Sequence, residues 1–183
     1  WRRPQDFRSV LVAAPVRGGR PAELQLGHGV DRIEALGRNA VVVGSDASDL
    51  HFQAVELTGN SAPQLGDRYT LERAAQGETR SHGFYFKPSP GLSHDTGDND
   101  NGVLALPVAR AGRAGHRQLA EGSAAITFLR RSDRRFAPLG ELFADDERVT
   151  DDNCKASCAD WYGNARPIFL RGRTFALMGY EIV

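Results

Sequence analysis

The chain has 183 residues, of which 40% are hydrophobic and 25% are charged, a composition typical of a globular domain with a sizeable core. Its 23 basic and 23 acidic residues cancel, so no net positive charge attracts nucleic acid or an anionic membrane. No apolar run approaches the roughly 20 residues of a membrane-spanning helix, so we expect no membrane span. We interpret residues 1–183 as one domain.

Short apolar or β-branched runs, each closed by Gly, Pro, Asn or Asp, recur along the chain. This pattern predicts β-strands joined by tight turns, and long amphipathic helices are missing. Short helical segments are expected only around Leu119 and over Cys154–Asp160. The predicted strands are Ser9–Ala14, Ile33–Leu36, Ala40–Val43, Leu50–Leu57, Gly83–Lys87, Val103–Val108, Ala124–Leu129, Pro167–Leu170 and Thr174–Val183.

Three junctions have the composition of hairpin turns. Arg171 and Gly172 separate two predicted strands, and glycine readily adopts the positive φ that a two-residue turn requires. The group from Gly37 to Asn39 predicts a three-residue loop in the same way. The basic segment Arg130–Arg135 is short and has no interleaved aromatic residues, so we interpret it as a hairpin tip rather than a nucleic-acid site.

The central predicted strands are regularly spaced. Val42, Phe84, Ile126 and Ala176 mark them at steps of 42, 42 and 50 residues. A period of about 40–50 residues with several strands in each unit is typical of β-propeller blades. The alternative is an all-β domain whose strands are evenly spaced by chance.

Two segments carry a resemblance to a known family. "RPIFLRGRTFALMGYEIV", at residues 166–183, resembles a strand pair in bacterial secreted β-propeller proteins distantly related to the WD-repeat group. "VDRIEALGRNAVVVGSDASDLHFQAVEL", at residues 30–57, is similar to a blade of the same proteins. The resemblance implies an all-β, propeller-like array of about four blades, either alone or as part of a larger propeller. It assigns no functional residue.

Cys154 and Cys158 are the only cysteines, and they lie beside Trp161 and Tyr162. A zinc site needs about four ligands, whereas the five histidines all lie upstream without ligand spacing. The redox C-x-x-C motif has two intervening residues, and this pair has three. We favour a disulfide, which would place the protein outside a reducing cytoplasm, with free buried thiols and a metal site as open alternatives.

The segment "QGETRSHGFYF" holds the best candidate for a polar binding site. On an extended strand, Glu78, Arg80 and His82 would share one face. A carboxylate, a guanidinium and an imidazole in one row could bind an anionic or sugar ligand or transfer protons. The alternative is a solvated edge on which Glu78 pairs with Arg80.

The segment "SHDTGDNDNG" gathers oxygen-bearing side chains that include Asp95, Asp98 and Asp100. Such loops can bind calcium, which takes six or more oxygen ligands. Asp and Asn also suit exposed turns without any ion, because they hydrogen-bond their own backbone. The EF-hand pattern does not fit, so a flexible loop is favoured and calcium is the alternative cofactor.

The sequence predicts an extracellular or periplasmic binding or structural module without catalytic residues. Its partner would be another protein chain or a missing segment of the same protein, and not nucleic acid. The alternative is a hydrolase or lyase that acts on a carbohydrate-like substrate through Glu78, Arg80 and His82. The chain opens on Trp1 and stops within a predicted strand, so we expect a fragment or processed form whose edge at Tyr180–Val183 pairs with a further strand.

Overall fold

A computed structural model describes residues 9–57, 62–89, 100–110, 123–143, 165–178 and 181–182. The cysteine pair, both expected helical segments, and the terminal residues Trp1, Tyr180 and Val183 lie outside these residues.

The described chain is all-β, as predicted, and consists of four antiparallel sheets that follow one another in chain order. Sheet A contains β1 (Ser9–Ala13) and β2 (Ala22–Leu26). Sheet B contains β3 (Arg32–Leu36), β4 (Asn39–Ser45), β5 (Leu50–Glu56) and β6 (Gln64–Leu71). Sheet C contains β7 (Ala74–Gln76), β8 (Tyr85–Pro88), β9 (Gly102–Arg110), β10 (Ser123–Ser132) and β11 (Arg135–Phe143). Sheet D contains β12 (Arg166–Leu170), β13 (Arg173–Met178) and β14 (Glu181–Ile182).

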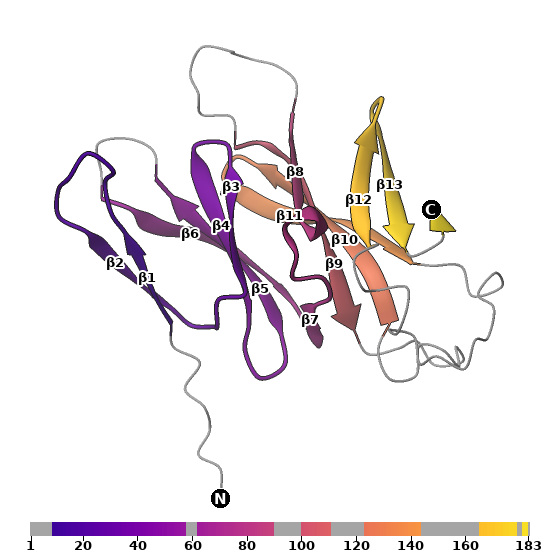
Figure 1. Cartoon of the computed structure of the whole chain (residues 1–183), viewed down its shortest axis with the longest axis horizontal. Helices are drawn as coiled ribbons and strands as arrows, with labels where there is room; N and C mark the ends of the chain where they lie inside the picture. The colour runs from indigo at the N-terminus through magenta and orange to yellow at the C-terminus, as the bar shows by residue number, and fades with distance from the viewer. Residues whose placement is uncertain are drawn as a thin grey trace, which may run out of the picture.

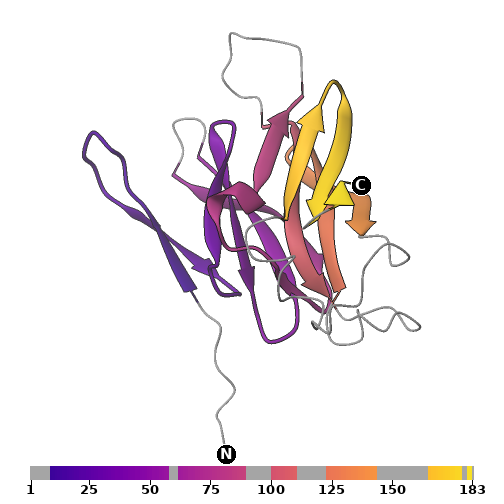
Figure 2. The same cartoon turned by 45° about the vertical axis from the view of Figure 1, so that its right-hand side comes forward.

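The four sheets stack face to face along the long axis of the molecule (Figure 1 and Figure 2). One apolar cluster, which includes Leu26 and Val42, joins sheet A to sheet B. The largest cluster, which includes Phe52 and Leu106, joins B to C, and a third around Phe128 joins C to D. Within the described residues the stack is open, and no sheet closes on itself.

Sheet B shows why the sequences of the inner strands are continuous apolar runs. Side chains alternate between the two faces of a strand, so Phe52 of β5 points toward sheet C while Val55 points toward sheet A. A sheet that is buried on both faces needs apolar side chains at both alternating positions. This burial accounts for "AVVV" in β4.

The predicted hairpins are confirmed, with one correction. Arg171 and Gly172 form a two-residue turn with positive φ at both residues, 49° and 77°. The tip between β10 and β11 is also a two-residue turn, at Asp133 and Arg134. The prediction of a three-residue loop at Gly37–Asn39 is wrong. Asn39 already pairs with Leu36, so only Gly37 and Arg38 remain in the turn.

Other strand predictions need correction. The sequence reading missed β2, β6, β7 and β11, which have many exposed or polar positions, and β11 also carries a bulge near Leu139. The run at Thr174–Val183 splits into β13 and β14. Of the four regularly spaced residues, only Phe84 lies outside a strand, just before β8.

Candidate functional site

The predicted row of Glu78, Arg80 and His82 lies in the connection between β7 and β8, both of which pair with β9. This connection is not an extended strand, since Ser81–Gly83 form a short 3-10 turn. The three side chains nevertheless meet. Arg80 Nε lies 3.8 Å from Glu78 Oε1, and His82 Nε2 lies 3.8 Å from Glu78 Oε2.

Glu78 and its neighbours hold the shape of this connection. The Glu78 carboxylate is buried and accepts the Arg80 N–H at 2.8 Å. Arg32 of β3 donates from Nη2 to the carbonyl oxygens of Glu78 and Arg80, at 3.0 and 2.8 Å. Gln76 Nε2 donates to the Glu78 carbonyl oxygen at 2.6 Å. The Arg32 hydrogen bonds join the β7–β8 connection of sheet C to β3 at the edge of sheet B.

The charges of this cluster limit what it can do. Burial is the main cause that lowers the pKa of the Arg32 guanidinium, while the Glu34 and Glu78 carboxylates oppose that change. Arg80 is exposed and His82 is partly exposed, so both side chains can meet a solute. The arrangement can present a cation and an imidazole above a buried carboxylate, but its hydrogen bonds also account for the shape of the loop without any ligand.

Of the three predicted calcium ligands, only Asp100 lies in the described part of the chain. Its buried Oδ2 accepts a hydrogen bond from Asn39 Nδ2 at 3.1 Å and lies 3.2 Å from Arg131 Nη2. Asp100 therefore takes part in a network between the sheets rather than in an exposed turn. Among the described residues no group of three or more His, Cys, Asp and Glu side chains could hold a metal ion.

This network surrounds Arg131, whose side chain is fully buried. Arg131 Nη2 of β10 lies 2.7 Å from Glu56 Oε1 of β5, and Arg131 Nη1 donates to the carbonyl oxygen of Arg134. The guanidinium lies over the Phe136 ring, 4.8 Å from its centroid. One cation of sheet C thus pairs with a carboxylate of sheet B and with Asp100.

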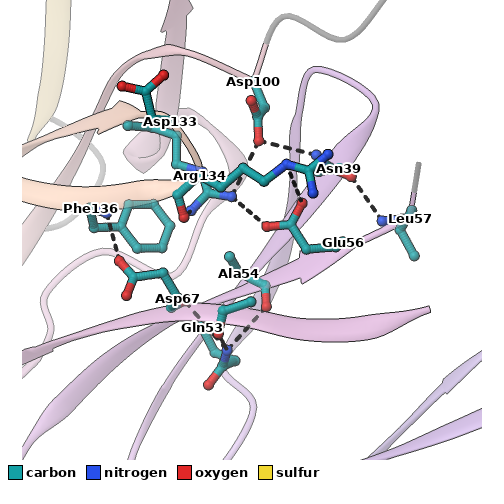
Figure 3. Close-up of polar contacts among 12 residues, drawn as sticks. Asn39, Gln53, Ala54, Glu56, Leu57, Asp67, Asp100, Asp133, Arg134 and Phe136 are labelled. Carbon is teal, nitrogen blue, oxygen red and sulfur yellow. Dashed lines mark hydrogen bonds and ion pairs between the residues drawn. The ribbon is translucent and has the colours of Figure 1, made fainter. Parts of the chain in front are cut away.

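Two further hydrogen bonds extend the network, one within sheet B and one between sheets B and C. Asn39 Oδ1 accepts the Leu57 N–H at 2.8 Å, and Asp67 Oδ2 accepts the Phe136 N–H at 2.7 Å (Figure 3). The predicted hairpin tip at Arg130–Arg135 is present, but that prediction did not indicate that Arg131 is buried. The sequence did contain a signal for this burial, because side chains alternate between the two faces of a strand. Arg131 lies two residues after Leu129 and therefore on the face of β10 that packs against sheet B.

A second cluster that the sequence did not reveal lies where sheet A meets sheet B. His51 Nε2 lies 2.8 Å from Asp46 Oδ2, and His51 Nδ1 lies 3.0 Å from Thr70 Oγ1. Because a carboxylate oxygen only accepts, the Nε2–H of His51 donates to Asp46. The buried His28 ring stacks on His51, with 4.9 Å between the ring centroids.

The charges in this cluster are set by its hydrogen bonds. The pKa of Asp46 is held well below its usual range by the N–H of Ser48, by His51 and by the N–H of Asp49. The pKa of His28 is lowered mainly because burial disfavours the imidazolium, although its bond to the Gly29 carbonyl oxygen opposes the change. This cluster has the hydrogen bonds of a hydroxyl, a base and an orienting carboxylate, and it also joins sheet A to sheet B.

The outward faces of the two end sheets form the clearest candidate for a binding surface. The face of sheet A that points away from B, here named the A face, consists of Val10, Val12, Glu23 and Gln25. The face of sheet D that points away from C, here named the D face, consists of Arg166, Ile168, Leu170, Arg173, Phe175, Leu177 and Ile182.

Both end faces expose apolar side chains. Val10 and Val12 are 49% and 56% exposed, and Leu170 and Ile182 are 57% and 64% exposed. Phe169 and Ala176 point the other way and pack against sheet C. The apolar residues of the D face belong to none of the clusters that join the described sheets.

Comparison of the chain with protein-family models, with curated proteins and with solved structures gives no match. No helix in the described ranges is long and apolar enough to cross a membrane.

Proposed function

We propose that this chain is an extracellular or periplasmic binding or structural module of the β-propeller type, whose end faces contact another protein chain or the rest of its parent protein. One observation carries this proposal. Sheets B and C each use both faces for packing, whereas sheets A and D each pack with one face and leave the other exposed.

The order of the sheets supports the propeller part of the proposal. Sheet B is a four-stranded antiparallel meander, and its neighbours follow face to face in chain order. Radially repeated sheets of this type form propeller blades. An array of repeated units buries each face against the next unit, so the end units need a partner or a polar surface.

The composition of the end faces supports association. A cluster of exposed apolar side chains on one face is typical of a protein–protein contact. Ile168 lies directly opposite Phe175 on the D face, and Leu177 lies opposite Ile182. The expected disulfide between Cys154 and Cys158 supports the compartment, because disulfides persist outside the reducing cytoplasm.

The test is the mass of the native material under non-denaturing and denaturing conditions. We expect either a complex heavier than the 19.9 kDa chain or a longer covalent chain, recovered from the extracellular or periplasmic fraction. Leu170→Asp should release the complex, whereas the matched control Leu139→Asp, at an exposed site on the β11 bulge, should retain it. A free 19.9 kDa monomer in native material would contradict the proposal.

A further inference from the structure

The A face and the D face differ in charge. On the A face, Glu23 of β2 lies directly opposite Val12, and Gln25 lies opposite Val10. The D face has an apolar centre with an arginine toward each end of the β12–β13 pair, because Arg173 lies opposite Leu170 and Arg166 lies opposite Leu177. One face therefore presents a carboxylate beside valines, and the other presents two guanidinium groups around aliphatic and aromatic side chains.

The same kind of contact already exists inside the chain. Sheet A is a two-stranded sheet that packs on sheet B through Leu11, Leu24 and Leu26. Sheet D packs on sheet C through Phe169, whose ring stacks on Tyr85 at 5.3 Å between centroids and meets Phe128 edge-on. Face-to-face packing of twisted antiparallel sheets thus joins each neighbouring pair of the four described sheets.

One chain cannot make this contact with itself in the described arrangement. Sheets A and D lie at opposite ends of the stack in both views (Figure 1 and Figure 2). A second copy placed at the end of the first brings its A face onto the D face and continues the stack.

Building on the proposed function, we infer that the partner of the D face is the A face of a second copy of this chain, in a head-to-tail contact. Val10 and Val12 pack on Ile168, Leu170 and Phe175. Glu23 lies near Arg173 or Arg166, so opposite charges meet across the contact. Each copy uses both of its end faces, and such a heterologous contact either closes into a ring or continues as an open array.

The test is self-association of the purified 183-residue chain, followed by analytical ultracentrifugation across a range of concentrations. We expect the wild-type chain to form oligomers. Val12→Asp and Leu170→Asp should each stay monomeric when alone, because each variant has lost one of the two faces. Mixed in equal amounts, they should form a 1:1 dimer through the two intact faces.

Two controls make the result specific. Leu139→Asp should assemble like the wild type, and all variants should keep the circular dichroism spectrum of the wild type, since the substituted positions are exposed. Glu23→Arg should weaken self-association at least tenfold, which corresponds to about 1.4 kcal/mol of binding free energy. Adding Arg166→Glu and Arg173→Glu to this variant reverses the charges on the other face and should restore self-association.

Several results would overturn the head-to-tail contact. A wild-type chain that stays monomeric at about 1 mM would exclude any self-contact of useful affinity. Oligomers that persist in Val12→Asp alone would mean that the D face pairs with itself. A different protein on the D face in native material would overturn the second copy as partner while leaving the proposed function intact.

Discussion

At the scale of single residues, Arg131 shows how much one buried cation contributes to holding two sheets together. Replacing it by methionine leaves the buried Asp100 carboxylate without its cation and leaves Glu56 with only the exposed Arg134, whose Nε lies 3.9 Å from Glu56 Oε2. Breaking a buried ion pair in this way costs about 3–5 kcal/mol. We expect Arg131→Met to lower the free energy of unfolding by that amount in urea titrations at pH 7.

The neighbouring residue provides the control for this substitution. Arg130 is exposed on the opposite side of β10, so Arg130→Met should change the free energy of unfolding by no more than about 0.5 kcal/mol. Equal effects at the two positions would show that the Arg131 network contributes nothing specific.

Asp46 predicts how stability depends on acid pH. The Ser48 N–H, His51 and the Asp49 N–H lower its pKa in the folded state, so the folded protein binds this proton less readily than the unfolded chain does. The resulting stabilisation is present above the unfolded-state pKa of about 4 and disappears as the pH falls through the folded-state value. Asp46→Asn should therefore be less stable than the wild type at pH 6, with the two unfolding curves converging in acid. A difference that stays constant from pH 6 to the acid limit would contradict this explanation.

At the scale of elements, Gly44 decides how closely sheet A approaches sheet B. A Cβ at this position would overlap the carbonyl oxygen of Gly29. Gly29 lies just after β2, and its N–H donates to the Ser45 carbonyl oxygen at 2.8 Å. Overpacking of this kind typically costs about 1–3 kcal/mol. We expect Gly44→Ala to lower the free energy of unfolding by that amount.

A second glycine in the same region tests whether the loss of stability at Gly44 comes from steric overlap rather than from replacing a glycine as such. At Gly27 a Cβ would meet only Arg68 Nη1, at an ordinary 3.6 Å. Gly27→Ala should therefore change stability by no more than about 0.5 kcal/mol in the same measurement. A loss at Gly27 as large as that at Gly44 would argue against the close approach as the cause.

At the scale of the whole molecule, an open stack predicts graded protection of the backbone. β4, β5, β9 and β10 lie inside sheets that are covered on both faces, whereas sheets A and D are covered on one. Local opening costs less where fewer apolar contacts must break. Amide hydrogen exchange, measured at a concentration where the chain is monomeric, should be slowest in the inner strands of B and C and fastest in sheets A and D. Uniform protection would indicate that the four sheets open as one unit.

The local features of this fold could be predicted from the sequence. Gly172 indicated a two-residue turn because its missing Cβ permits a positive φ, and the turn is there. "AVVV" indicated a strand, and β4 is there, with both of its faces buried. The outer strand β11 was missed because Pro138 and Gly140 resemble loop residues, although here they lie at a bulge.

The sequence by itself determined the all-β class, the positions of three hairpin turns and the inner strands, because these depend on backbone preferences and on the period of apolar residues over a few positions. Only the tertiary structure decided which polar residues are buried. Arg131 and Glu56 are 75 residues apart, and Arg131 and Asp100 are 31 residues apart, yet they form one network. Such pairs leave no local pattern, because a charge can be buried only where a distant segment supplies its counterion.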